Sequence, residues 1–235
     1  MSLKTYILNM LRSAILILFL FTNSSLFCQI DSKESLVSKY YHAVGDYSRL
    51  YTGVQYINYD IMIEGDQFFP FEEGYKTSLT YMGNDYENIT LLYDTHLDEV
   101  LIVHDKTLYT KLIKSEVDNF TIDDHHFIHL TDIDKSKGIY ELLYTKNLSV
   151  LVKHHNEIEE TIKGTQVIRS FVNEKSYYIL RSDSLVSISK KNSFLQFFGG
   201  DKKKIKNFIK KERLNFNKDK QNTIIQSITY YETLP

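Results

Sequence analysis

The sequence predicts a mainly β fold of the β-rich α+β class: an antiparallel meander that forms a sandwich or a partly open barrel, with an N-terminal helix and a C-terminal helical hairpin. The composition favours strands, since the 235 residues include 18 tyrosines, 14 phenylalanines and only two prolines. From about residue 50 to 191, apolar and polar residues alternate with a period of two, which is typical of half-buried strands. The helical period of 3.6 residues in the apolar positions appears only before and after this region.

The first 28 residues have the pattern of a cleavable secretory signal. Lys4 and Arg12 precede an unbroken apolar run over 14–21, and a short polar stretch leads to Cys28. That run is much shorter than the roughly 20 residues that a spanning helix needs. We therefore expect 1–28 to be a signal peptide, and 29–235 to be a single β-rich globular domain exported to the periplasm or the extracellular space.

Cys28 leaves one alternative open, a lipid anchor on this residue. Phe27 is bulky where the lipidation signal calls for a small residue, so we expect cleavage after Cys28 instead. The remaining chain then contains no cysteine, which excludes a disulfide framework and thiol catalysis.

Residues 31–45 are predicted to form the N-terminal helix, because Asp31 and Glu34 resemble a capping box. About eleven to thirteen short strands should follow, joined by tight Asn, Asp and Gly turns. The sequence places a break at 173–175. The principal predicted strands are 75–81, 86–93, 100–103, 108–113, 117–122, 127–130, 139–144, 148–154, 166–172, 177–180 and 185–189.

The helical hairpin is expected at about 201–234, with Asp201 capping the first helix and the second beginning near Asp219. The segment 190–220 has a net charge of +8, so the first helix is strongly basic. It is either the solvated face of a helix packed on the sheet or a contact for anionic lipid or an acidic partner. The lysines of this possible anionic-surface contact are Lys202, Lys203, Lys204, Lys206, Lys210 and Lys211.

Several strand-and-turn segments resemble a group of uncharacterised exported proteins of Bacteroidota-type bacteria. They are Tyr51-Thr-Gly-Val-Gln-Tyr56, the stretch from Tyr81 to Asp94, Asp98-Glu-Val-Leu-Ile102, Gly138-Ile-Tyr-Glu-Leu-Leu-Tyr144 and the ending from Asp201 to Tyr231. The resemblance implies export and covers nearly the whole chain after the signal. It implies no activity and no catalytic residues.

Histidines are the first candidates for a site. His125 and His129 share a face of one predicted strand but lie about 13 Å apart, so a metal site would need a ligand from another strand. His154 and His155 are the obvious source. The pattern favours histidines on a half-exposed strand over a metal site.

Acidic residues give weaker signals. Asp132 and Asp134 resemble the start of a calcium loop, but Lys137 and Leu143 stand where that loop requires Gly and Glu. Three carboxylate pairs are expected at turns: Asp98-Glu99, Asp123-Asp124 and Glu159-Glu160.

We predict no catalytic residue, no cofactor and no metal ligand, and the sequence favours a protein that is not an enzyme. The leading hypothesis is a binding module of the cell envelope whose tyrosines serve recognition of another envelope protein. One alternative is a periplasmic carrier of a lipid-like apolar ligand, and another is a hydrolase whose site is not visible in the sequence. Nucleic-acid binding is not expected, because aromatic residues are not interleaved with the lysines.

Overall fold

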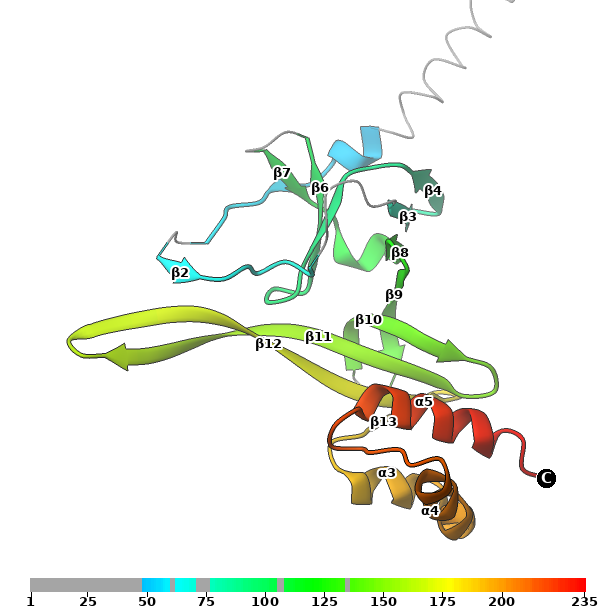
Figure 1. Ribbon diagram of the computed structural model, residues 1–235. Coiled ribbons are helices and arrows are strands. Elements are labelled where there is room, and N and C mark those ends of the chain that lie inside the picture. Colours follow the sequence, from blue (N-terminus) through cyan, green and yellow to red (C-terminus); the bar gives the residue numbers. More distant parts are fainter. Residues whose placement is uncertain (1–47, 60–61, 71–76, 105–107, 134–135) are drawn as a thin grey trace, which may run out of the picture. The chain divides into compact units, whose positions relative to one another are not determined.

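The computed structural model describes residues 48–235 apart from 60–61, 71–76, 105–107 and 134–135 (Figure 1). The predicted signal peptide 1–28 with Cys28, and the predicted helix 31–45, lie outside the described residues. So do the start of the predicted strand 75–81 and Asp134 of the calcium-like segment.

A four-stranded antiparallel sheet lies in the first half of the described chain and follows a short 3₁₀ helix, η1 (Arg49–Tyr51). Its order is β1-β7-β6-β5. The strands are β1 (Val54–Gln55), β5 (Leu91–Asp94), β6 (Glu99–Val103) and β7 (Tyr109–Lys111). Buried Asp94 ends β5 and accepts hydrogen bonds from the backbone N–H groups of His96 and Leu97 and from the Tyr56 hydroxyl, which holds the β5–β6 turn.

The second sheet has the order β13-β12-β11-β10-β9-β8-β3-β4, and β2 pairs in parallel with β12. From β8 to β13 each strand pairs antiparallel with the next, which confirms the predicted meander. Neither sheet closes into a barrel in the described residues. A 3₁₀ turn, η2 (Lys114–Glu116), precedes β8. The strands are β2 (Ile63–Glu64), β3 (Thr77–Tyr81), β4 (Asn84–Glu87), β8 (Val117–Ile122), β9 (His125–Ile133), β10 (Ser136–Thr145), β11 (Ser149–Lys163), β12 (Gln166–Arg181) and β13 (Ser184–Ser187).

An aromatic core joins the two sheets. Tyr93 of β5, Phe120 of β8 and Phe127 of β9 are all buried, and the Phe120 and Phe127 rings stack with centroids 4.7 Å apart. Burying such large rings removes much apolar area from water, so this cluster is a main source of stability where the two sheets meet.

The C-terminal part is helical, as predicted: the two helices expected at 201–234 are present, and a third, shorter α-helix precedes them. The three are α3 (Lys191–Phe197), α4 (Lys202–Lys211) and α5 (Lys220–Tyr231), with a 3₁₀ turn η3 (Gly199–Asp201) between the first two. Their apolar faces share a core with β11 and β12, where Ile205, Ile209 and Ile224 meet Val150 and Ile179.

Three local predictions were wrong. The predicted strand 86–93 is two strands, β4 and β5, separated at 88–90 where Asn88 has a φ of 55°. The predicted break at 173–175 lies within β12, which runs unbroken from Gln166 to Arg181. Glu159-Glu160, predicted at a turn, lies in the middle of β11. In the last two cases the paired strand supplies the hydrogen bonds of a polar segment that local preference assigns to a turn.

Candidate functional site

Strands β11 and β12 extend beyond the rest of their sheet as a long two-stranded ribbon (Figure 1). β11 pairs with β10 only over 149–152, but it pairs with β12 along its whole length, over 149–163. A two-residue turn, Gly164-Thr165, joins the strands, and Gly164 has a φ of 64°, a backbone conformation that favours glycine in such tight hairpins. The outer ribbon, residues 157–172, is therefore a projection whose strands support mainly each other.

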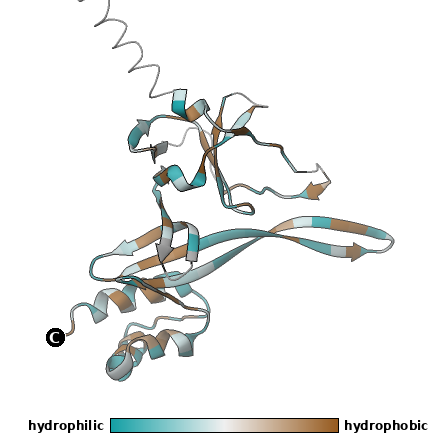
Figure 2. Ribbon diagram, turned by 180° about the vertical axis from the view of Figure 1, so that it is seen from behind, coloured by the Kyte–Doolittle hydropathy of each residue, from teal (hydrophilic) through white to brown (hydrophobic). Residues whose placement is uncertain are grey.

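Apolar side chains continue into the exposed outer ribbon, where Figure 2 shows hydrophobic segments alternating with hydrophilic ones. Ile162 is 76% exposed, and Val167, directly opposite it in the register, is 58% exposed. Cross-strand apolar neighbours stabilise a ribbon when they are covered. Here the pair faces solvent close to the turn, and this is the most prominent exposed apolar feature of the ribbon.

At the base of the ribbon the sheet forks, because β10 turns away from β11 beyond the pair Glu141–Val152. Asp98, at the end of the β5–β6 turn, reaches this fork. Its carboxylate accepts hydrogen bonds from Lys153 Nζ and from the backbone N–H of Ile139, and Lys153 also donates to the Ile139 carbonyl oxygen at 3.0 Å. One partly buried ion pair thereby ties both arms of the fork to the first sheet.

The Asp98 carboxylate has two further donors, the Tyr93 hydroxyl at 2.7 Å and Lys114 Nζ at 3.3 Å. Burial lowers the pKa of Lys153, and the neighbouring Asp98 opposes that shift. Gly138 is required beside this pair. A Cβ atom there would lie 2.6 Å from an Asp98 carboxylate oxygen, and its φ is 135°.

A second polar cluster lies where β9, β10 and β11 meet. The two oxygens of Glu141 accept hydrogen bonds from different imidazoles, His125 Nδ1 at 2.5 Å and His154 Nε2 at 2.5 Å. The Phe69 ring packs edge-on against both imidazoles, with centroid distances of 5.0 and 4.9 Å. Glu141 and His154 are buried, so this cluster joins three strands and does not present His154 to a substrate.

The electrostatics of this cluster follow from burial and from the short hydrogen bonds. Burial lowers the pKa of His154, and the bond to Glu141 opposes that shift. Burial by itself would raise the pKa of Glu141, but the hydrogen bonds from His154 and His125 outweigh it and hold that pKa below its ordinary value. The resulting arrangement is an ionised carboxylate held by two imidazole donors.

The histidines named from the sequence are therefore divided among different environments. His125 and His154 converge on Glu141. His129 Nδ1 lies 3.1 Å from the Val117 carbonyl oxygen, and burial lowers its pKa. His155 points to the exposed face of the ribbon, where its Nε2 lies 3.2 Å from a carboxylate oxygen of Glu174.

Three ligand-type side chains gather at that exposed position: His155, Glu157 and Glu174, whose ligand atoms lie within 4.8 Å of one another. Of the three, only His155 was a candidate from the sequence: Glu157 gave no signal of its own, and Glu174 lies in the segment predicted as a turn. The signal that could have identified it is the register, since a continuous antiparallel hairpin about the Gly164-Thr165 turn places Glu174 opposite His155.

The lysines of the basic helix are exposed, which both alternatives require, a solvated face and a contact for an anionic partner. Lys202, Lys203, Lys206 and Lys210 of α4 are exposed, as are Lys204 and Lys211, while Ile205 and Ile209 are buried. Lys204 pairs with Asp201 at 2.8 Å, and that carboxylate raises the pKa of Lys204. Asp201 precedes α4 as predicted, but its side chain makes no capping hydrogen bond to the helix.

Six of the tyrosines serve the core rather than a recognition surface. These buried side chains are Tyr56, Tyr81, Tyr86, Tyr93, Tyr140 and Tyr177. Tyr51, by contrast, is 61% exposed. Packing of the sheets thus accounts for a third of the 18 tyrosines, and the tyrosine-rich composition does not itself mark an interaction surface.

A hollow of about 340 Å³ opens beside the ribbon. Its apolar lining comes from Phe68, Phe69 and Phe171, and its polar lining includes Asn156 and Asn173. The Asn156 amide donates to the Asp66 carbonyl oxygen, and Asn173 donates to the Asn156 side-chain oxygen. The hollow is therefore braced by amide hydrogen bonds and is large enough to receive one or a few side chains of a partner.

No family model, characterised protein or solved structure matches this chain. Within the described ranges, none of the helices combines the length and apolar character that crossing a membrane requires.

Proposed function

We propose that this chain is an exported, non-catalytic module of the cell envelope that binds another envelope protein through the outer β11–β12 ribbon. The observation that carries the proposal is the ribbon itself. The described residues supply no strand partner for the outer edge of β11 over 157–163, and Ile162 and Val167 form an exposed apolar pair beside that edge.

An unpaired strand edge offers a row of backbone donors and acceptors, which is the usual template for adding a strand from a partner. An isolated two-stranded ribbon is also only marginally stable in water. A partner strand along β11 would satisfy the edge and cover the apolar pair. The hollow between Phe68, Phe69 and Phe171 lies beside the ribbon and would accept an apolar side chain of the partner.

The export half of the proposal rests on the residue pattern of 1–28. The intact mass of the protein recovered from an envelope fraction tests it. We expect a mass that begins at Gln29, without Cys28. A mass that includes residues 1–28 would contradict cleavage, and an acyl increment on Cys28 would replace the soluble form with a lipid-anchored one.

The binding half is tested by cross-linking in envelope extracts with a photoreactive residue at Thr161, on the exposed outer part of β11. We expect a discrete cross-linked product that the double substitution Ile162→Ser and Val167→Ser abolishes. The control is Val54→Ser with Ile113→Ser, which removes apolar side chains of 68% and 44% exposure that lie outside the ribbon. Retention of the product in the ribbon variant, or no product in any growth condition, would overturn the proposal.

A further inference from the structure

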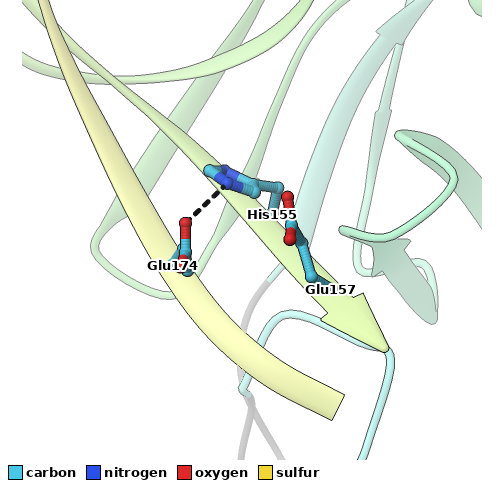
Figure 3. A group of neighbouring side chains, drawn as sticks. All are labelled: His155, Glu157 and Glu174. Carbon is cyan, nitrogen blue, oxygen red and sulfur yellow. Dashed lines mark ion pairs between the residues drawn. The ribbon is translucent and has the colours of Figure 1, made fainter. Parts of the chain in front are cut away.

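We propose that His155, Glu157 and Glu174 form a binding site for a divalent transition-metal ion such as Zn²⁺ on the exposed face of the ribbon. Figure 3 shows the imidazole and both carboxylates on one side of the strand pair, with His155 and Glu157 on β11 and Glu174 on β12. The proposal does not depend on the proposed function, because it concerns the chain alone.

The backbone places the three ligands together for simple geometric reasons. Side chains two residues apart on a strand point to the same face, so His155 and Glu157 are neighbours. Glu174 lies directly across from His155 in the antiparallel register and is a diagonal neighbour of Glu157. This arrangement needs no loop rearrangement to bring a nitrogen and two carboxylates to one point.

The distances suit a small ion. Zinc binds imidazole nitrogen and carboxylate oxygen at about 2.0–2.2 Å, so ligand atoms around a tetrahedral ion lie about 3.4 Å apart. His155 Nε2 and the nearer Glu174 oxygen are 3.2 Å apart, and the three ligand atoms lie within 4.8 Å of one another. Small side-chain rotations of Glu157 and Glu174 are enough to close the remaining gap.

Charge favours a cation at the same place. Glu157 and Glu174 bring two carboxylates within 4.8 Å, and Glu159 follows on the same face of β11. Like charges at neighbouring positions of a strand pair are destabilising. The nearest basic side chain on this face of β11, Lys153, already pairs with Asp98. A bound divalent ion would therefore relieve the repulsion between the glutamates.

The site is accessible and its backbone is held. The His155 side chain is 27% exposed and that of Glu174 is 54% exposed, which gives an ion a path from solvent. On either side of His155 the chain is anchored, by buried His154 on Glu141 and by buried Asn156 on the Asp66 carbonyl oxygen. Ligands on strands anchored in this way are better organised than ligands on loops.

The ligand set selects the class of metal. One imidazole with two carboxylates suits zinc and similar first-row divalent ions better than calcium, which takes six to eight oxygen ligands. Three protein ligands leave at least one coordination position of a tetrahedral ion for water or for a group from a bound molecule.

The test is an isothermal calorimetric titration of the EDTA-stripped full chain with ZnCl₂. The visible absorption spectrum of the chain with CoCl₂ is a second readout of imidazole and carboxylate coordination. We expect one site per chain. His155→Asn and Glu174→Gln should each weaken it by at least about tenfold, by analogy with the loss on removing even supporting groups of zinc sites. Circular dichroism establishes that these variants are folded, and all the substituted positions retain a polar side chain.

The controls separate this site from its neighbours. His126→Asn removes another imidazole, and Glu159→Gln removes a carboxylate from the same face of the ribbon, so neither should change affinity appreciably. His125→Asn tests the Glu141 cluster as a competing metal site. Absence of zinc binding, binding unchanged by His155→Asn, or binding lost only in His125→Asn would overturn the proposal.

Discussion

At the scale of single residues, the described structure uses buried and partly buried carboxylates to connect its segments. Asp94 holds the β5–β6 turn, Asp98 ties that turn to the fork of the second sheet, and Glu141 joins three strands through two imidazoles. Near the C-terminus Glu232 accepts from the Tyr144 hydroxyl at 2.6 Å and so fixes the end of α5 to β10. Each carboxylate is satisfied by donors from distant segments, which is the condition for burying charge at acceptable cost.

The Glu141 cluster predicts a loss of stability in mild acid. Burial lowers the pKa of His154 and of His129 below the ordinary value of 6.5. Below that pH the unfolded chain therefore binds more protons than the folded chain. The stability that these two neutral histidines contribute is fully present above about pH 6.5 and is lost as the pH falls toward their folded-state pKa values. The free energy of unfolding, measured by urea denaturation, should fall between pH 7 and pH 5.

His154→Gln identifies the part of this fall that belongs to the cluster, because glutamine keeps a neutral donor near Glu141 and does not titrate. We expect a shallower fall in stability with pH in this variant, with a remaining contribution from His129. His126→Gln is the matched control. Equal slopes in the wild type and in His154→Gln would contradict the assignment. Glu141 also lowers stability as the pH falls, but only below its ordinary pKa of about 4.5, because its lowered pKa is then approached and its protonation removes the ionised acceptor.

At the scale of elements, the β11–β12 ribbon combines a firmly held base with a weakly supported outer part. The base is packed against β10, the helices and the Asp98 turn, while the outer part is a two-stranded ribbon that pairs with β2 only at two residues, Arg169 and Ser170. Local opening should therefore be easiest near Gly164 and rare at Val150 and Val152, which are fully buried.

Asp98→Asn should destabilise the base of the ribbon, where β10 and β11 diverge. The substitution leaves Lys153, whose side chain is only 18% exposed, without its anionic partner. Removing one partner of a fully buried ion pair costs about 3–5 kcal/mol of unfolding free energy, and we expect about 2 kcal/mol for this partly buried pair. Hydrogen exchange should show increased opening around Ile139 and Lys153.

The control for this prediction is Glu160→Gln, which breaks the ion pair with Arg169 on the outer ribbon. Both side chains there are more than half exposed, so we expect a change below about 1 kcal/mol. Similar losses of stability in the two variants would mean that the Asp98 pair is not the connection that we describe.

At the scale of the whole molecule, positive charge is concentrated in the C-terminal helices, on the opposite face from their apolar side chains. The segment 190–220 carries a net charge of +8 within a chain of net charge −2, and the structure exposes its six candidate lysines while Ile205 and Ile209 pack in the helical core. With those two side chains buried, α4 cannot insert an apolar face into a lipid layer without losing the core that it shares with β11 and β12.

Association with anionic vesicles should therefore be purely electrostatic. In co-sedimentation with phosphatidylglycerol vesicles, we expect any binding to disappear at about 1 M salt, where charges are screened within about 3 Å. Lys202→Glu combined with Lys206→Glu should abolish binding at low salt, and charge reversal at Lys146 and Lys163, outside α4, is the control. Binding that persists at high salt would show that an apolar face is exposed after all.

The predicted fold was largely correct because its signals are local. Alternation with a period of two placed most strands, and the helical period placed the C-terminal helices. The errors lie where local preference and tertiary pairing disagree. Residues 155–163 of β11 and 173–175 of β12 are mostly polar, and only the pairing of β11 with β12 makes them strands of a ribbon.

By itself, the sequence determined the β-rich class, the antiparallel meander, the C-terminal helices and the basic character of α4. The first three follow from periodicity along the chain and the last from composition. Only the tertiary structure decided which polar residues meet. Glu141 with His125 and His154, Asp98 with Lys153, and His155 with Glu174 each unite residues 13 to 55 positions apart. The physical reason is that a side chain's neighbours are set by strand register and by the branching of the sheet, and a shift of a single residue in the register would turn every one of these side chains to the opposite face.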